Sequence, residues 1–275
     1  MNAYLVSHNG LGDNLFMIGS LRFLSQFYNK IFFVCKSKYF DNVSLFFIDN
    51  PKIKCVRVEE NGEMNNVVNL LKPKYKNNDI FVCGCFKRWL KSKITNKKLL
   101  NYKIESNNYN LNYDTINSKN YNFINNFYKD IGLNLTVFYE YFNLPENKLS
   151  QYLFNLVKDY RIIFIQLKSS NNKKLNIKNL IDKYLYDDKT ILICNDQNLY
   201  NINSENPIIK QKKEIAQNFI CNKIIYYKDT ILNANEIYII DSCFIGIILP
   251  YLKTNRLKAE TIRIIKRDLA NKFIL

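Results

Sequence analysis

Short apolar runs alternate along this chain with longer segments whose apolar positions recur every three or four residues. Runs rich in β-branched and aromatic residues are typical of strands, and the three-to-four-residue spacing is typical of helices with one buried face. In the first half the pattern predicts strands at 2–7, 31–36, 53–58, 79–83 and 136–141, and helices at 14–28, 39–48, 64–71 and 121–131.

The alternation stops near Leu144-Pro145-Glu146-Asn147 and then begins again. The second half predicts strands at 162–166, 190–194, 223–226, 236–240 and 261–266, and helices at 175–185, 214–219, 230–235 and 244–253. Alternating strands and helices favour a parallel sheet covered on both faces. We therefore expect an α/β protein with two Rossmann-like domains, 1–145 and 146–275, facing a cleft. Residues 95–122, rich in Asn, Tyr and Lys, show no period and are either a surface excursion or a meander whose pattern the composition obscures.

Ligands of open parallel sheets bind beyond the carboxyl ends of the strands, so the loops that follow strands are the first places to look for chemistry. The first is His8-Asn9-Gly10-Leu11-Gly12-Asp13-Asn14. Its two glycines allow close approach of a ligand, but the spacing is not that of a dinucleotide fingerprint. Asp13 either presents a carboxylate to a ligand or caps the following helix. His8 either shares the role of base, donates to a diphosphate as a neutral imidazole, or is a buried structural residue.

Two loops of the second half carry residues that could bind phosphate or hydroxyl groups. Gln166, Lys168, Ser169 and Ser170 follow one predicted strand, and an ammonium group with hydroxyls at a helix N-terminus suits a phosphate. The alternative is a solvated polar turn. The other loop, Asp241-Ser242-Cys243, ends a buried strand, and it either binds hydroxyls and phosphate or only caps the next helix.

Composition limits the other classes of function. The net charge of +16 raises the possibility of a nucleic-acid partner, but the basic excess is spread over both halves. One histidine and seven cysteines, mostly in strand-like runs, predict buried free thiols and no metal site. No apolar run reaches the ~18 residues of a membrane span and no signal peptide is evident, so we expect a cytoplasmic protein. The basic segment Lys87–Lys98 could contact an anionic membrane or a phosphorylated acceptor, or could be a solvated loop.

Two motifs carry a resemblance to a known class. The stretch SHNGLGDNLFMIGSLRFL resembles the N-terminal motif of GT-B glycosyltransferases, particularly heptosyltransferase-like enzymes, and more loosely that of fucosyltransferase-like enzymes. The stretch ILNANEIYIIDSCFIGIILPYL resembles their donor-side element. The histidine that the heptosyltransferase motif has after its Asp is absent from 244–248, and the fucosyltransferase His-x-Arg-Arg motif is also absent.

The resemblance implies a glycosyltransferase that moves a sugar from a nucleoside-diphosphate sugar to a hydroxyl of a glycan, glycolipid or glycoprotein. It implies Asp13 as the general base, Lys168 and Ser169 near the donor phosphates, and Asp241 and Ser242 as the donor-side pair. No Asp-x-Asp motif is present, so we expect a metal-independent reaction with the nucleotide sugar as co-substrate and no other cofactor. The alternatives are a basic nucleic-acid-binding protein and a catalytically inactive GT-B scaffold.

Overall fold

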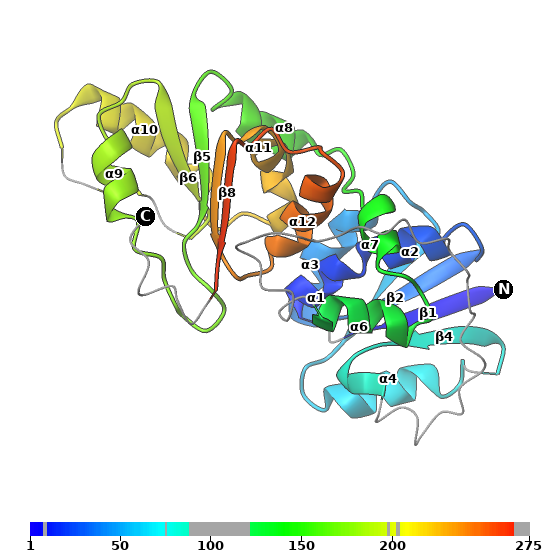
Figure 1. Ribbon diagram of the computed structural model, residues 1–275. Coiled ribbons are helices and arrows are strands. Elements are labelled where there is room, and N and C mark those ends of the chain that lie inside the picture. Colours follow the sequence, from blue (N-terminus) through cyan, green and yellow to red (C-terminus); the bar gives the residue numbers. More distant parts are fainter. Residues whose placement is uncertain (8–9, 75, 88–121, 197–198, 202–203, 267–275) are drawn as a thin grey trace. The chain divides into compact units, whose positions relative to one another are not determined.

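The computed structural model describes residues 1–275 except 8–9, 75, 88–121, 197–198, 202–203 and 267–275 (Figure 1). The chain divides into two compact units, Met1–Pro145 and Glu146–Leu275. The predicted excursion at 95–122 lies, except for Asn122, outside the described residues, and so does all but Lys87 of the basic segment 87–98.

The first unit is built on a parallel sheet in the order β3-β2-β1-β4. Its strands are β1 (Asn2–Val6), β2 (Lys30–Lys36), β3 (Ile53–Val58) and β4 (Asn78–Val82). Its helices are α1 (Leu11–Phe16), α2 (Ile18–Leu24), α3 (Phe40–Val43), α4 (Glu63–Leu71), α6 (Asn122–Asp130) and α7 (Thr136–Glu140), with 3-10 turns at Ser37–Tyr39 and Ser44–Phe47. The expected helix at 14–28 is therefore two short helices, and the one at 39–48 is a run of short turns.

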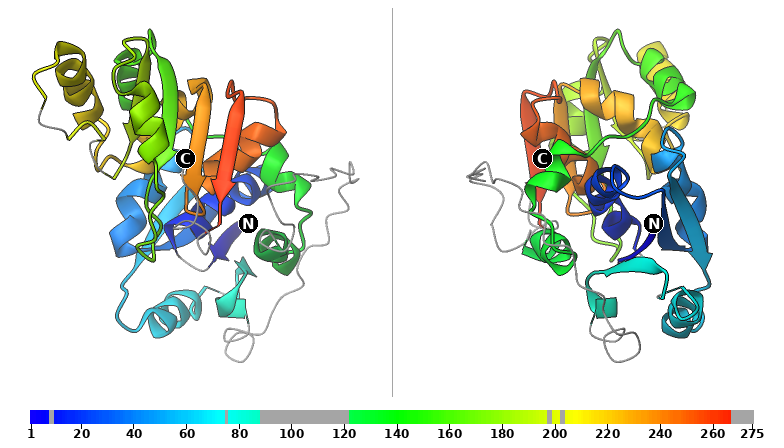
Figure 2. Two further views of the ribbon diagram at one scale, coloured as in Figure 1. Left: turned by 60° about the vertical axis from the view of Figure 1, so that its left-hand side comes forward. Right: turned by 90° about the vertical axis from the view of Figure 1, so that its right-hand side faces the viewer.

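Both faces of this sheet are covered, as the sequence pattern predicts. Tyr4 and Val6 of β1 pack with Val67 and Leu71 of α4 on one face, while the alternate residues Ala3 and Leu5 are fully buried on the other. Burial on both faces is the reason why the strands of a parallel sheet are apolar at consecutive positions. Figure 2 shows helices on either side of the strands in each unit.

The strand predicted at 136–141 is wrong, because this segment is the helix α7. Thr136, Val137 and Phe138 are all buried, so they show no alternation of buried and exposed positions. Asn134 begins the turn by accepting a hydrogen bond from the Thr136 N–H through its Oδ1 (2.9 Å). A Cβ added to Gly19 of α2 would lie 2.5 Å from the carbonyl oxygen of Val137, so α2 and α7 approach closely at this point. Tertiary packing here overrides the strand propensity of the sequence.

The second unit repeats the design with the strand order β6-β5-β7-β8, again with all pairs parallel. Its strands are β5 (Arg161–Gln166), β6 (Thr190–Cys194), β7 (Glu236–Ile240) and β8 (Thr261–Ile265). Its helices are α8 (Lys148–Asn155), α9 (Lys178–Tyr184), α10 (Pro207–Gln217), α11 (Lys228–Asn233) and α12 (Ile245–Lys253). The strand predicted at 223–226 is wrong: Ile224–Tyr227 form a 3-10 turn whose apolar side chains are buried around Tyr227.

The cysteines are all free, as expected, although not all are buried. Cys35, Cys83 and Cys194 are buried, whereas Cys85 and Cys221 are exposed. Among the described residues, no helix combines the length and the hydropathy needed to span a bilayer.

Candidate functional site

The carboxyl end of β1 leads into α1, which carries Asp13. Gly10, with extended backbone, is the residue before the first turn, so Asp13 is not the N-cap residue but the third residue of the helix. A Cβ built on Gly10 would lie only 2.6 Å from Asp13 Oδ2, which shows that the carboxylate folds back over the start of the helix. The free N–H groups there stabilise a negative charge. The interpretation of Asp13 as an N-cap is therefore wrong.

Asn14, next to Asp13, is fully buried. Its Oδ1 accepts a hydrogen bond from Ser7 Oγ at the end of β1 (3.4 Å), and its Nδ2 has no hydrogen-bond partner among the described residues. A buried amide without a partner costs free energy, and such groups are frequent at binding sites. His8 and Asn9 lie outside the described residues, Gly10 and Gly12 are half-buried, and the predicted roles of all four stay predictions.

The loop after the neighbouring strand β4 lies close to Asp13. Burial raises the pKa of the Cys83 thiol well above its usual value, and the negative charges of Asp130 and Asp13 raise it further. Asp130 holds this loop through two contacts, because its Oδ2 accepts from the Gly84 N–H (2.9 Å) and its Oδ1 pairs with Lys87 Nζ (2.6 Å). Lys87, the one described residue of the basic segment, is thus tied to an acid of its own unit.

In the second unit, the loop after β5 differs from the sequence interpretation. Residues 168–174 fold back on themselves as a hairpin, with a bridge between Lys168 and Lys174, and α9 begins only at Lys178. The hydroxyl of Ser169 is buried and bonded to Asn171 and to the Lys173 carbonyl oxygen, and Ser170 is exposed. Lys168 and Ser169 therefore do not lie at a helix N-terminus, and the expectation of one is wrong. The expectation fails because the chain satisfies its polar groups locally before the helix begins.

Gln166 closes β5 with a side chain that is almost fully buried. Its Nε2 donates to the Lys168 carbonyl oxygen (2.7 Å), and its Oε1 has no partner among the described residues. Ser242, after the adjacent strand β7, likewise has a buried hydroxyl for which the described residues offer no partner. Asp241 extends the sheet through its N–H, which donates to Ile265 (2.9 Å), and Cys243 is half-buried before α12 begins at Ile245.

The sequence interpretation missed Asn195 and Asp196, which follow β6. Asn195 Oδ1 and Asp196 Oδ2 are buried and unpaired within the described part of the chain. Burial raises the pKa of the Asp196 carboxyl above its usual value, while the Lys168 N–H and the charges of Lys168 and Lys174 act in the opposite direction. The signal was present, because a carboxylate within two residues of the end of a fully buried strand is also the pattern that singled out Asp241.

The strands β6, β5 and β7 are parallel neighbours, so these groups lie together at one edge of the sheet, the edge formed by the carboxyl ends of the strands. The atoms without partners are Gln166 Oε1, Asn195 Oδ1, Asp196 Oδ2 and Ser242 Oγ. All four are oxygens that accept hydrogen bonds, and two lysines, Lys168 and Lys174, lie near enough to Asp196 to influence its charge. The edge is thus suited to a ligand that offers hydroxyl or N–H donors and also carries negative charge.

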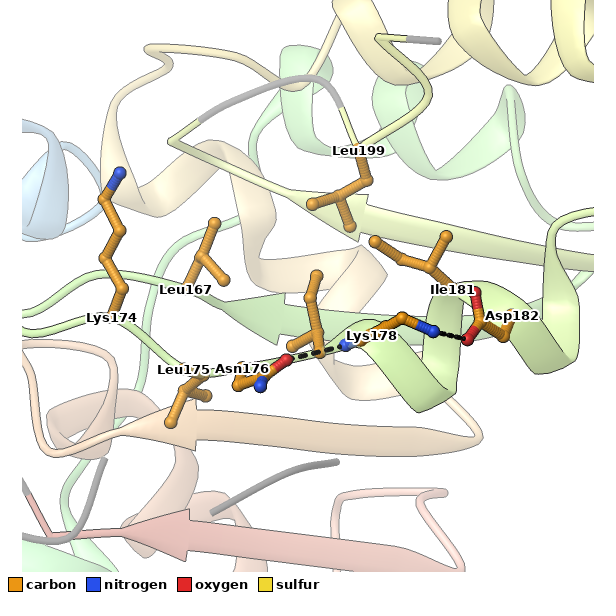
Figure 3. A pocket seen from close by; sticks show the side chains of 9 residues that line it. Leu167, Lys174, Leu175, Asn176, Lys178, Ile181, Asp182 and Leu199 are labelled. Carbon is orange, nitrogen blue, oxygen red and sulfur yellow. Dashed lines mark hydrogen bonds and ion pairs between the residues drawn. The ribbon is translucent and has the colours of Figure 1, made fainter. Parts of the chain in front are cut away.

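A pocket of about 340 Å³ opens beside this edge, between the hairpin and α9 (Figure 3). Its walls are largely apolar, from Leu167, Leu175, Ile177, Ile181 and Leu199. Lys174, Asn176 and Lys178 also line it, and Lys178 is already paired with Asp182 (2.6 Å). Among the described residues, no group of three His, Cys, Asp or Glu side chains is placed to hold a metal ion.

No family model and no curated protein matches the sequence. Solved structures do match the fold. The ADP-heptose LPS heptosyltransferase II of E. coli superposes with a TM-score of 0.54 at 11% identity, over 96% of this chain and 90% of that one. A glycosyl transferase family 9 protein of Veillonella parvula superposes with a TM-score of 0.53 at 11% identity, over 99% and 90%. The chain has the GT-B fold. The resemblance to heptosyltransferase-like enzymes is confirmed at the level of the fold, and the prediction of an α/β architecture with two parallel sheets is confirmed with it.

Proposed function

We propose that this GT-B protein is a glycosyltransferase that uses a nucleoside-diphosphate sugar as donor and a hydroxyl group as acceptor. The observation that carries the proposal is the position of the chemically active groups. In the second unit, buried polar atoms without partners among the described residues gather where parallel strands end, the position at which open α/β sheets bind ligands. In the first unit, Asp13 lies in the helix that follows β1. The fold shared with a heptosyltransferase supports the same reaction class.

In this proposal the second unit holds the donor. The four unpaired oxygens accept hydrogen bonds from hydroxyl groups of the ribose or the sugar, with Asp196 as the charged member of the set. Lys168 and Lys174 supply positive charge toward the diphosphate. Ser242, at the turn before α12, and Asp241 complete the donor side, while Ser169 is committed to its own hairpin and contributes little.

In the first unit, Asp13 acts as the general base that takes the proton from the acceptor hydroxyl. The free N–H groups at the start of α1 favour the negative charge of this carboxylate, and an ionised carboxylate can take a proton. The departing diphosphate would be stabilised by the lysines rather than by a metal ion, in line with the absence of an Asp-x-Asp motif from the sequence. His8 is the next candidate for the base.

A thermal-shift panel followed by a transfer assay tests this function. Nucleoside diphosphates with different bases, nucleotide sugars and oligonucleotides are added separately to the full-length protein. We expect one nucleoside diphosphate to raise the melting temperature, and its sugar conjugates then to be consumed in the presence of acceptor, with EDTA making no difference. Stabilisation by oligonucleotides alone would contradict the proposal, and nucleotide binding without any transfer would indicate an inactive scaffold.

A further inference from the structure

The break between α1 and α2 coincides with a side chain inserted from a distant part of the chain. The hydroxyl of Tyr128, in α6, donates to the Phe16 carbonyl oxygen (2.7 Å) and accepts from the Ser20 N–H (3.2 Å). Phe16 and Ser20 are four residues apart, so in a continuous helix these two backbone groups would bond each other directly. The phenol oxygen bridges them instead, and a side chain inserted into this ladder is a recognised cause of helix breaks.

Tyr128 is held firmly in this place. Its side chain is fully buried, and its ring packs against Phe138 of α7, with 6.0 Å between centroids. Phe138 also contacts the ring of Phe16, and α7 lies directly against α2 at Gly19. The tyrosine is therefore fixed by α7 on one side and by the helix break on the other.

The same turn of α6 also reaches the next loop. Asp130, two residues after Tyr128, accepts from the Gly84 N–H and pairs with Lys87, both in the loop after β4. Strands β1 and β4 are neighbours, and the C-terminal end of α6 holds both the loop after β4 and the junction of the two helices that follow β1. One helix end, more than a hundred residues from α1 in sequence, thus fixes two segments that follow adjacent strands.

We infer that Tyr128 is a positioning residue for Asp13 and Asn14, an inference that rests on the proposed function for its catalytic consequence. By keeping Phe16 and Ser20 apart, Tyr128 lets α1 leave the direction of α2. Without the hydroxyl, the Ser20 N–H and the Phe16 carbonyl oxygen either bond directly or lose their partner. In both cases α1 changes its orientation, and the carboxylate of Asp13 moves with it.

The test compares Tyr128→Phe with Tyr28→Phe. Tyr28 is also buried in the first unit, and its hydroxyl donates to Asp79 Oδ2 (2.7 Å). Asp79 lies near the amino end of β4, whereas Asp13 lies beyond the carboxyl end of β1. Each variant therefore removes one tyrosine hydroxyl and keeps the ring. Hydrogen exchange followed by mass spectrometry measures the backbone, and kcat and donor KM measure the reaction.

We expect Tyr128→Phe to speed exchange in the peptide covering 10–20 by about tenfold. We expect kcat to fall by about 10- to 100-fold with donor KM changed less than twofold, since a small misplacement of a reacting group is costly. Tyr28→Phe should change neither of these quantities. Unchanged exchange at 10–20, or altered exchange with wild-type kcat, would overturn the inference. If the wild type transfers no sugar, the proposed function fails, while faster exchange in Tyr128→Phe still supports the positioning of α1.

Discussion

Lys212 gives a prediction whose size follows from the structure. This lysine of α10 is almost fully buried, and its ammonium donates to the carbonyl oxygens of Tyr184 (2.9 Å), Leu185 (3.2 Å) and Asp187 (2.5 Å). These carbonyls lie at and just beyond the C-terminal end of α9, where no N–H of the helix can reach them. The lysine therefore joins α10 to the end of α9, and its charge lies at the negative end of the helix dipole.

Lys212→Met keeps most of the apolar stem and removes the three donors. A buried acceptor left without a partner costs about 1–3 kcal/mol. The Asp187 carbonyl oxygen keeps the Thr190 N–H as a donor (3.3 Å), so the two carbonyls that lose their partner, those of Tyr184 and Leu185, would cost about 2–6 kcal/mol. Removing a buried ammonium also removes part of a desolvation penalty. We expect a net loss of about 1–3 kcal/mol, or about 3–12 °C in the melting temperature of a unit of this size.

Thermal denaturation followed by circular dichroism measures the effect, with Lys210→Met as the control. Lys210 lies on the same helix, and its ion pair with Glu205 is exposed, so its loss should cost less than about 1 kcal/mol. If Lys212→Met had the same melting temperature as Lys210→Met, the hydrogen bonds to the end of α9 would only balance the cost of burying the charge. The reasoning would then fail.

Three further predictions concern the candidate site and the sheet beneath it. Asp13→Asn should lower kcat by about 10²–10⁴-fold with little change in nucleotide affinity or melting temperature, because Gly10 and not Asp13 precedes the helix; a fully active variant would exclude Asp13 as the base. Asp196→Asn should raise the melting temperature, because burial opposes the charge of this carboxyl, yet weaken nucleotide binding measured by calorimetry; a gain in both would remove Asp196 from the site. Burial alone would raise the pKa of Glu236, but hydrogen bonds from Tyr238 and Arg161 outweigh it and hold that pKa below its usual value. The ionised Glu236 therefore contributes its full stability above the unfolded pKa of about 4.3, and this contribution is lost as the pH falls through the lower folded value. When the pH is lowered, the free energy of unfolding of Glu236→Gln should fall less steeply than that of the wild type.

The buried strands were predictable because their signal is local. The apolar runs that became β5 and β7 are continuous, and the polar residues that end them mark the loops where chemistry lies. The break at Met17 and the helix α7 were not predictable in this way. The break depends on Tyr128, which is distant in sequence, and α7 depends on packing against Gly19. The secondary-structure propensity of a segment depends on its own residues, so it contains no information about either long-range contact.

The positions of the candidate residues could be predicted in part, for the same reason. Asp13, Lys168, Asp241 and Ser242 do follow strands and Gln166 ends one, but a hairpin takes the place of the helix expected directly after Lys168. Ser169 shows how this matters, because its hydroxyl bonds within the hairpin. Asn195 and Asp196 needed no long-range information. They directly follow the predicted strand at 190–194, as Asp241 follows the predicted strand at 236–240.

In the second unit, unpaired buried atoms gather where the strands end. Four such residues lie at the end of a strand or directly after it: Gln166, Asn195, Asp196 and Ser242. The others that the described residues leave unpaired, Asn14, Arg22, Thr136, Asp229 and Thr230, lie in helices. The hydroxyls of Thr136 and Thr230 can turn toward a backbone carbonyl with a small rotation. The oxygens of Gln166, Asn195 and Asp196 only accept hydrogen bonds, so no carbonyl can satisfy them, and the described residues offer them no donor. Each costs stability when unpaired, so a ligand that satisfies several of them at once would recover that cost on binding, and this is the physical reason for expecting the donor at this edge of the second sheet.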